Sequence, residues 1–443
     1  MARVLLVMPR LPQRLGPPYL GQQLVAAGLL RAGHEVRVVD LSAARCTSGD
    51  EAVVAEVARF SPDMVGMTLF TVNAARGYAL AERLRGGGQV PLLVAGGPHA
   101  TVCPGEPEAH GFDVSLGGEG EHAMVALAAG RLDVPRSAPP IEDLDALCFA
   151  LESYPCFDRA AYSADGRTIV PGGLMTSRGC PARCTFCANY VTGRAYRFRS
   201  PASVVAEMVA LSERYGVRHF PFWDDAFTAL RPRLEALCDA ILAEPRLRGV
   251  TWTCITPGNM VKPFDLQRMR RAGCMAINFG IESGDYNILR IIQKGQRPEH
   301  VRAAVAAAKA EGMTTIVNFM FGFPEEGVAE LDRTLELMAD LAPHTDFFNN
   351  RGVLVPFPGT AIYDRWHAEY RFTGWWLDPA KVPLEPDLFA LTADEAQRAL
   401  ETDPTLDLDF FRYSDAVREK IAECVRAKAL HNQGTVARMR RAA

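Results

Sequence analysis

The stretch that decides the fold reads Leu174-Met-Thr-Ser-Arg-Gly-Cys180-Pro-Ala-Arg-Cys184-Thr-Phe-Cys187-Ala-Asn-Tyr190. Its three cysteines share one loop directly after an apolar strand. Thiolates are the usual ligands of iron–sulfur clusters, and three of them leave one iron of a [4Fe–4S] cluster open for another ligand. A zinc site needs a fourth Cys or His, but the nearest downstream histidine is His219, and a redox CxxC pair does not need Cys180. The stretch therefore predicts a [4Fe–4S] cluster on Cys180, Cys184 and Cys187.

Strands and helices alternate regularly from this stretch onward. We expect strands at residues 173–177, 217–223, 250–255, 276–280, 314–321 and 347–355, and helices at 201–215, 231–242, 263–272, 298–311 and 328–342. This alternation predicts a partial (β/α)6 barrel in the α/β class. A barrel of this kind carries its active site at the carboxyl ends of its strands.

The N-terminal part alternates in the same way and predicts a doubly wound, Rossmann-like parallel sheet, with its ligand site beyond the carboxyl ends of the strands. Its expected strands are 3–8, 35–40, 64–68, 91–95 and 114–116, and its expected helices are 20–32, 50–60, 74–85 and 122–129. We divide the chain into this domain (1–134), a Pro-rich linker (135–168), the barrel (169–362) and a small helical C-terminal region (363–443). The last region contains Phe372, Trp375 and Trp376 and a final helix at 414–430.

Composition restricts the class of protein. The 443 residues are 48% hydrophobic and 23% charged, with a net charge of −4. These values are typical of a globular protein and give no sign of a nucleic-acid or membrane surface. We interpret the basic run at 438–441 as a solvated chain end. The odd count of 11 cysteines argues against a disulfide framework. No secretory signal and no apolar run of about 18 residues are present, so we expect a cytoplasmic protein.

The cysteine loop, with Phe186 before the last cysteine, resembles the signature of the radical S-adenosylmethionine (SAM) superfamily. Four further segments resemble elements of that family at the ends of later barrel strands: 222–227, 280–284 with Leu289 and Lys294-Gly295 behind it, 322–326 and 356–360. The resemblance implies that SAM chelates the open iron and is cleaved to a 5′-deoxyadenosyl radical that abstracts hydrogen from the substrate. It also implies a one-electron donor of the flavodoxin or ferredoxin type.

The N-terminal domain resembles the cobalamin-binding domain fused to one branch of this superfamily, at 17–21, 96–100 and 118–121. The familiar cobalt-ligating histidine is missing, because the loop at 8–16 has none and the first histidine is His34. Radical methyltransferases of this branch often bind cobalamin without one, so cobalamin stays open as a cofactor. We expect His99, after the fourth strand, to be a surface or capping residue.

Polar residues at the expected strand ends are the candidate site. The resemblance implies cofactor contacts for Phe186, Asp224, Glu282 and Ser283, and we expect Asp225 and Glu325 to be a catalytic acid and base. Helix capping is the alternative for the two aspartates, and first-turn stabilisation is the alternative for Glu325 and Glu326. Candidates for hydrogen bonds to a polar substrate, with structural roles as the alternative, are Asn318, Asn349, Asn350 and Arg351.

Three functions fit these features. The first is radical dehydration of a 1,2-diol in an aminosugar, because the chain resembles radical diol dehydratases of aminoglycoside antibiotic biosynthesis, as in the apramycin pathway. The second is cobalamin-dependent C-methylation in a natural-product pathway, and the third is a non-catalytic scaffold with a vestigial barrel. The first two imply a small polar metabolite as substrate, and dehydration to a ketone implies a downstream reductase.

Overall fold

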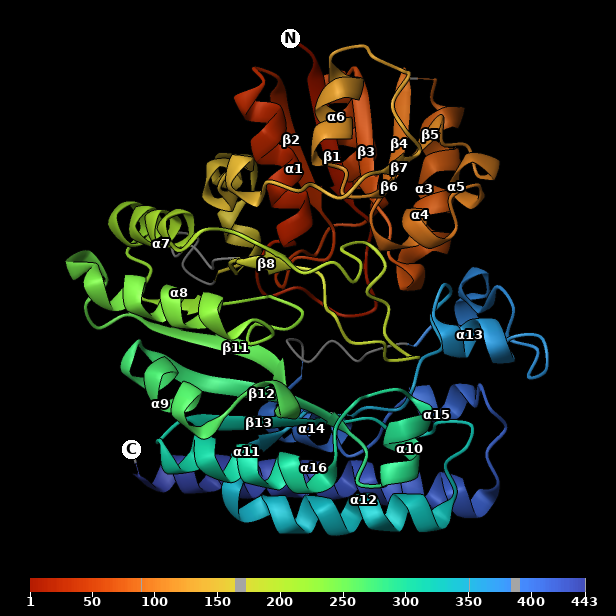
Figure 1. Cartoon of the computed structure of the whole chain (residues 1–443). Helices are drawn as coiled ribbons and strands as arrows, with labels where there is room; N and C mark the ends of the chain where they lie inside the picture. Colours follow the sequence, from red (N-terminus) through yellow and green to blue (C-terminus); the bar gives the residue numbers. More distant parts are fainter. Residues whose placement is uncertain (89, 164–172, 350, 384–390, 443) are drawn as a thin grey trace.

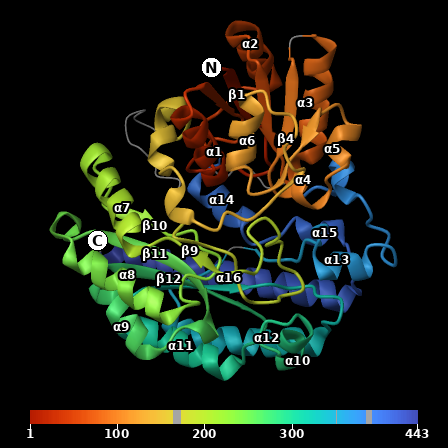
Figure 2. The same cartoon turned by 45° about the horizontal axis from the view of Figure 1, so that its top comes forward.

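The computed structural model describes residues 1–88, 90–163, 173–349, 351–383 and 391–442. It contains two five-stranded parallel sheets, one in the N-terminal part and one in the barrel. The N-terminal domain sits over the barrel, with the segments of the cysteine loop between them (Figures 1 and 2). The predicted fold class is therefore confirmed, and the predicted cysteine loop lies between the two domains.

The N-terminal sheet has the order β2-β1-β3-β4-β5, with every described pair parallel. Its strands are β1 (Arg3–Met8), β2 (Glu35–Asp40), β3 (Met64–Thr68), β4 (Leu92–Gly96) and β5 (Val114–Ser115). Its helices are α1 (Leu20–Arg31), α2 (Asp50–Phe60), α3 (Ala74–Gly86), α4 (Pro98–Val102), α5 (Glu106–Ala109) and α6 (Glu121–Ala128). Alternate residues of the buried strand β1 point to opposite faces, so Val4 and Leu6 pack with α1 and α6 while Leu5 and Val7 pack with α2 and α3.

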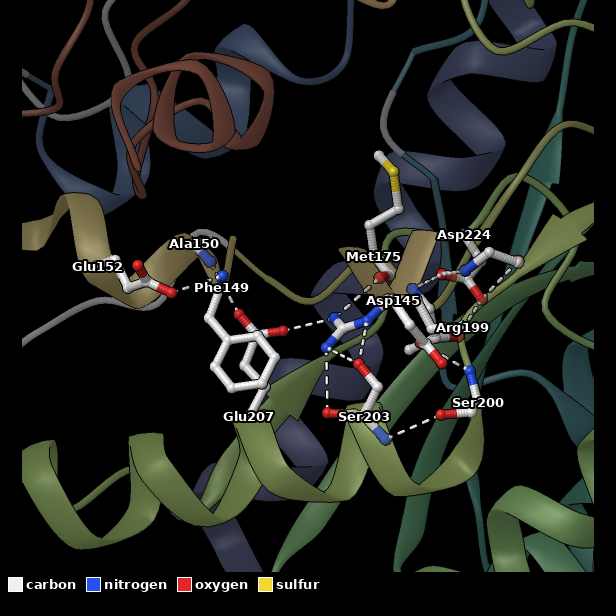
Figure 3. A network of polar contacts seen from close by, with 12 residues as sticks. Asp145, Phe149, Ala150, Glu152, Met175, Arg199, Ser200, Ser203, Glu207 and Asp224 are labelled. Carbon is white, nitrogen blue, oxygen red and sulfur yellow. Dashed lines mark hydrogen bonds and ion pairs between the residues drawn. The ribbon is translucent and has the colours of Figure 1, made fainter. Parts of the chain in front are cut away.

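The segment expected as a linker is ordered where the structure describes it. A strand pair joins β6 (Gly117–Gly118) to β7 (Ser137–Ala138), and three 3-10 turns follow at Leu144–Ala146, Ala150–Cys156 and Arg159–Ala161. The second turn is tied to the barrel, because the Ala150 amide donates to Glu207 Oε1 over 2.9 Å and Arg199 donates to Glu207 Oε2 over 2.5 Å (Figure 3). Nearby, the Ser200 amide donates to Asp145 over 2.9 Å. The described linker therefore packs onto both domains.

The barrel sheet has the order β10-β11-β12-β13-β14. Its strands are β10 (His219–Pro221), β11 (Thr251–Pro257), β12 (Cys274–Glu282), β13 (Thr314–Phe319) and β14 (Phe347–Phe348). Its helices are α7 (Pro201–Tyr215), α8 (Arg231–Ala243), α9 (Pro263–Arg271), α10 (Tyr286–Ile291), α11 (Pro298–Ala310) and α12 (Val328–Leu341). The outer faces of the strands pack against α7, α8, α9, α11 and α12 in one large core, while the buried residues of α10 pack in the core that contains α2 and α3.

The first barrel strand is shorter than predicted. Leu174 makes an isolated parallel bridge with Phe222, while β8 (Ser177–Arg178) pairs antiparallel with β9 (Arg197–Phe198). The cause is local. Residues 176–177 bond to Asp224 and to β9 at the end of the cysteine loop, and not to a neighbouring strand of the barrel sheet. The last expected strand, 347–355, is also short, and Asn350 within it lies outside the described residues.

The C-terminal region joins both domains. Its helices are α13 (Ala361–Trp366), α14 (Ala393–Ala399), α15 (Thr405–Leu408) and α16 (Asp415–Ala442), and α16 lies beside α12 (Figure 1). The final helix is longer than the predicted 414–430, because Asn432 donates to the Phe348 carbonyl over 2.8 Å and ties the extra turns to β14. Phe372, Trp375 and Trp376 are buried in the same core as α2 and α3. No helix in the described ranges is long and apolar enough to cross a bilayer.

Candidate active site between the two domains

The three cysteines lie on the loop that joins β8 to β9. Gly179 adopts φ +86° at the start of the loop, a conformation that favours glycine, and the Cys180 amide donates to the Gly193 carbonyl over 3.1 Å. All three thiols are free, with Cys180 and Cys184 half-buried and Cys187 exposed. The Thr185 amide donates to Ile292 and the Ile362 amide donates to Thr185, both over 3.0 Å. The loop is thereby held between α10 and α13.

The thiol spacing fits a cluster better than a single metal ion. In the described parts of the chain, the one set of three candidate ligands whose atoms all lie within 4.8 Å of one another is His99, Cys103 and Glu106. The thiols of Cys180, Cys184 and Cys187 are therefore wider apart than a mononuclear zinc site requires, since zinc–sulfur bonds are about 2.3 Å long. Burial raises the pKa of the Cys184 thiol to about 11, and the nearby ammonium of Lys294 opposes that rise. The donor set fits an iron–sulfur cluster.

The two adjacent aspartates after β10 point in different directions. Asp224 is buried and accepts from the amides of Thr176 and Ser177 over 2.6 and 3.1 Å and from both of their hydroxyls. Arg233 also lies against it at 3.4 Å. Its carboxylate thus bonds to the chain itself and holds the start of the cysteine loop, and its cofactor contact stays a prediction.

Asp225 faces the cysteine loop. It accepts from Asn189 and Thr192 over 3.1 and 3.0 Å, and its charge acts on Cys180 and Cys187. It is reached from solvent, yet the surrounding protein desolvates it enough to raise its pKa; the Asp224 carboxylate adds to this rise and the two hydrogen bonds oppose it. A carboxylate here is available to accept hydrogen bonds from a ligand of the cluster.

Glu282 lies at the end of β12, at a break in the register with β13. It adopts φ +75°, an uncommon conformation for a residue with a side chain and one found preferentially at functional sites. Its carboxylate pairs with Lys294 over 2.6 Å. Phe186 packs on Phe323 with ring centroids 5.8 Å apart and faces the Lys294 ammonium at the same distance. The predicted cofactor residues Glu282 and Phe186 therefore share one corner of the site.

Ser283 and the two glutamates after β13 have other surroundings. Ser283 is fully buried, and its hydroxyl accepts from the Asp285 amide over 3.1 Å and meets Thr334 at 3.3 Å, which is a turn-stabilising role. Glu325 pairs with Arg365 of α13 over 3.4 Å. Glu326 is buried and accepts from the Gly322 amide over 2.7 Å, and burial raises its pKa to about 8. No contact in the described ranges joins Glu325 to Asp225.

The expected substrate residues divide in two. Asn318 points to the inner face of the barrel, as the alternation along β13 requires, and donates to Asn278 on β12. Asn349 instead accepts from the Phe319 amide over 3.0 Å and from Lys428 over 3.2 Å, and Arg351 is buried and donates to the Ala399 carbonyl over 3.4 Å. Asn318 therefore lies on the inner face of the barrel, whereas the contacts of Asn349 and Arg351 fasten the C-terminal region to the barrel.

A buried ionic network connects the cysteine loop to the N-terminal domain; we call it the interdomain clamp. Arg178, two residues before Cys180, donates to Glu119 over 2.8 Å and to Glu121 over 2.5 Å. Arg197, on β9, donates to both oxygens of Glu119 and to the Ile141 carbonyl. All four charged side chains are at least nine-tenths buried. The clamp fixes the base of the cysteine loop against the turn before α6.

The ligand edge of the N-terminal sheet faces the same loop. A side chain added to Gly96, at the end of β4, would meet nothing within 4 Å, so there is free space at this strand end. Tyr19 lies edge-on to Phe70 at 5.0 Å, and its pKa, raised to about 12 mainly by burial, is also influenced by Arg178 and Asp225. Tyr190 of the cysteine loop lies near Thr71, which opposes the rise that burial causes in the pKa of Tyr190. The end of β4 thus has room for a ligand atom at Gly96.

His99 is not the surface residue that we expected. It is fully buried, contacts Thr71 at 3.3 Å through Nδ1, and lies 3.0 Å from Tyr78 and 3.1 Å from Glu106 through Nε2. Trp376 of the C-terminal region donates to the same Glu106 oxygen over 2.8 Å. These partners satisfy the imidazole and the carboxylate, so His99 serves a second contact between domains and is not free to ligate a metal.

Comparisons with known proteins agree with this geometry. The model of the radical SAM superfamily matches residues 174–338, and the model of the B12 binding domain matches residues 17–128. An uncharacterized methyltransferase of Pyrococcus horikoshii is 31% identical over 392 residues, covering 82% of each chain. The chain belongs to the radical SAM superfamily, in the branch with an N-terminal B12-binding domain. A [4Fe–4S] cluster and SAM are the cofactors of this superfamily.

Two more distant relatives of this radical SAM enzyme are named as a methyltransferase and as a cyclase. Bacteriochlorophyllide d C-12(1)-methyltransferase of Chlorobaculum tepidum is 26% identical, covering 71% of this chain and 68% of that protein. The anaerobic magnesium-protoporphyrin IX monomethyl ester cyclase of Rubrivivax gelatinosus is 26% identical, covering 76% and 64%.

Two solved structures share the fold of both domains. The radical SAM methyltransferase TsrM of Kitasatospora setae, with cobalamin and a [4Fe–4S] cluster bound, has a TM-score of 0.65 at 20% identity and covers 84% of this chain and 78% of that one. The cobalamin-dependent enzyme OxsB has a TM-score of 0.64 at 15% identity, covering 85% and 56%.

Several residues of the site could not be identified from the sequence. The clamp glutamates lie in a segment that carried the cobalamin-domain resemblance, but nothing in the sequence indicates that they pair with Arg178 and Arg197. The sequence places Lys294 in a segment that resembles the family but does not indicate its role. A buried arginine two residues before the first cysteine is a usable signal, because an arginine at such a site needs an acidic partner.

Proposed function

We propose that this radical SAM enzyme is a cobalamin-dependent methyltransferase that acts on a carbon of a small polar metabolite. The observation that carries the proposal is that the clamp holds the base of the cysteine loop directly against Glu119 and Glu121 of the N-terminal domain. Ligands of the two domains would then share one space. The methyltransferase names of relatives such as the Pyrococcus horikoshii protein support the same reaction class.

The cofactors carry the difficult chemistry of this reaction. When bound, the cluster and SAM supply a carbon-centred radical by one-electron cleavage, and cobalamin supplies a methyl carrier. The protein binds and orients these cofactors. The Asp225 carboxylate lies near Cys180 and Cys187 and can accept a hydrogen bond from an ammonium group, and the Glu282 carboxylate lies near Cys184 and can accept hydrogen bonds from ribose hydroxyls. A flavodoxin- or ferredoxin-type protein is the electron donor that we propose.

Diol dehydration, our first expectation, has less support. It needs an acid and a base at the same substrate, and we expected Asp225 and Glu325 to supply them. Asp225 lies by the cysteine loop, whereas Glu325 is held by Arg365 on α13. Methylation needs no such pair. Asn318 and its partner Asn278, on the inner face of the barrel, are the groups that we propose for holding the substrate.

Cobalamin retention by the full-length protein tests the proposal. The protein is reconstituted anaerobically with iron, sulfide and hydroxocobalamin and passed through gel filtration, and bound corrin is measured from its visible spectrum. We expect about one cobalamin per chain. Gly96→Leu should abolish retention because its side chain fills the open edge, whereas Gly86→Leu, at the end of α3 with equally free space around it, should retain cobalamin. A wild-type protein that elutes without corrin would contradict the proposal.

A further inference from the structure

Lys294 places a positive charge beside the cysteine loop. Its ammonium faces the ring of Phe186, the residue before Cys187, at 5.8 Å, and the Ile292 carbonyl, two residues before Lys294, accepts from the Thr185 amide over 3.0 Å. The side chain is only 9% exposed and lies 2.6 Å from Glu282. Lys294 is therefore a buried positive charge next to the cluster site.

The local fold fixes this position. After α10 the chain turns sharply, with φ +55° at Gln293 and φ +69° at Gly295, and the Lys294 amide donates to the Leu289 carbonyl over 2.9 Å. Gln296 donates to the Ile281 carbonyl over 2.8 Å and thereby fastens the turn to β12. Gly280 leaves the necessary room, because a Cβ there would lie 3.0 Å from both the Lys294 ammonium and the Glu282 carboxylate.

Burying an ammonium costs free energy unless a strong interaction offsets it. The Glu282 carboxylate supplies one such interaction. A salt bridge on the surface would bring the same two charges together without the cost of desolvation, so their burial at this place calls for a further reason. The negative charge of a thiolate-bound cluster beside Lys294 would supply that reason.

We propose that Lys294 is a positioning residue that raises the reduction potential of the [4Fe–4S] cluster by stabilising its reduced state. Reduction adds one electron from an external one-electron donor to the cluster, with no proton taken up, so the net charge becomes more negative by one. A nearby positive charge favours that state, and net charge, hydrogen bonding and exposure are the factors that set the potentials of such clusters. Glu282 acts in the opposite direction on the same cluster, so the pair balances the field at the open iron.

This inference depends on the cluster and not on the methyl transfer proposed above. It holds for any reaction that follows reduction, and its test omits both SAM and cobalamin. A failure of the inference is therefore distinct from a failure of the proposed function.

The test is an electron paramagnetic resonance redox titration with dithionite on the full-length, anaerobically reconstituted protein, with iron content measured in parallel. We expect Lys294→Met to lower the midpoint potential, Lys294→Arg to keep it near that of the wild type, and Glu282→Gln to raise it. The matched control is Lys309→Met, which removes a lysine paired with Asp346 over 2.6 Å on α11, away from the cluster. This variant should leave the potential unchanged.

An unchanged potential in an iron-replete Lys294→Met variant would overturn the inference. If that variant fails to take up the cluster, the Glu282→Gln titration decides: a higher potential supports the inference, and an unchanged or lower one overturns it. A purely structural role would alter iron content or stability without moving these two midpoints in opposite directions.

Discussion

Glu119 is the residue whose replacement tests the interdomain clamp most directly. Its side chain is 1% exposed and accepts from Arg197 over 3.0 Å, from Arg178 over 2.8 Å and from the Ile141 amide over 2.8 Å. Glu119→Gln keeps the shape but removes the charge. Arg178 retains Glu121 at 2.5 Å, whereas Arg197 is left buried with no carboxylate partner and with neutral acceptors such as the carbonyls of Ile141 and Thr192.

The expected cost follows from that geometry. Removing one partner of a buried ion pair costs about 3–5 kcal/mol. Because the amide keeps part of the hydrogen bonding, we expect about 3 kcal/mol for Glu119→Gln. The matched control is Asp340→Asn, which breaks the exposed pair with Arg302 at 2.9 Å and should cost less than about 1 kcal/mol.

Urea unfolding of the apo protein, followed by tryptophan fluorescence, provides the measurement. Two domains can unfold in separate steps, so the interaction is best isolated by a double-mutant cycle between Glu119→Gln and Arg197→Met. We expect a coupling energy of at least about 2 kcal/mol, and a lower iron content after reconstitution because Arg178 leads into the cysteine loop. A coupling energy no larger than that of the Arg302–Asp340 pair would refute the reasoning.

The clamp also gives the protein an acid limit. Burial raises the pKa of Glu119, but the hydrogen bond from Arg197 and the charge of Arg178 outweigh it, so the pKa is lowered overall. A carboxyl whose pKa is lower in the folded state adds stability above its unfolded pKa of about 4.3 and loses it as the pH falls through the folded value. Glu119→Gln should therefore lose less stability than the wild type between about pH 5 and pH 3, when the free energy of unfolding of each protein is compared with its own value at neutral pH.

Two further predictions concern single side chains. Burial raises the pKa of Glu326 to about 8. A carboxyl whose pKa is higher in the folded state stabilises the fold at low pH, and this contribution is lost as the pH rises toward the folded pKa. Glu326→Gln should therefore flatten the loss of stability between about pH 5 and pH 9, and a pH profile identical to that of the wild type would contradict this. Cys184→Ala should remove the visible absorbance of the cluster and the formation of 5′-deoxyadenosine from SAM, while Cys148→Ala, a half-buried cysteine of the linker, should keep both. Cluster assembly in Cys184→Ala would disprove the assignment of the three ligands.

The cysteine loop could be predicted from the sequence because its chemistry is local. A cluster site needs three thiolates on one short segment, and the strand before them is apolar, so spacing and neighbours carry the information. The strands and helices around it followed from periodicity for the same reason. Their ends were less certain: α16 continues past residue 430 because the side chains of His431 and Asn432 bond to the chain around β14, a tertiary contact that periodicity does not contain.

The contacts between domains could not be predicted. Glu119 and Arg178 are 59 residues apart, and their pairing depends on how two separately formed sheets dock. The same limit applies to Asp224 and Asp225. Adjacent residues at a strand end point to opposite sides, but the sequence does not say which side the protein covers. In the structure, Asp224 bonds to the covered chain segment at Thr176, whereas Asp225 faces the cysteine loop.

These contacts have a common consequence for catalysis. The B12-binding edge and the cluster loop come from different domains, and the clamp holds them together independently of any ligand, while the Trp376–Glu106 hydrogen bond at 2.8 Å holds the C-terminal region to the same N-terminal domain. Reacting groups must be held in place to well under 1 Å for efficient catalysis. Loosening either contact should therefore impair the turnover that needs both cofactors more than it impairs the binding of either one.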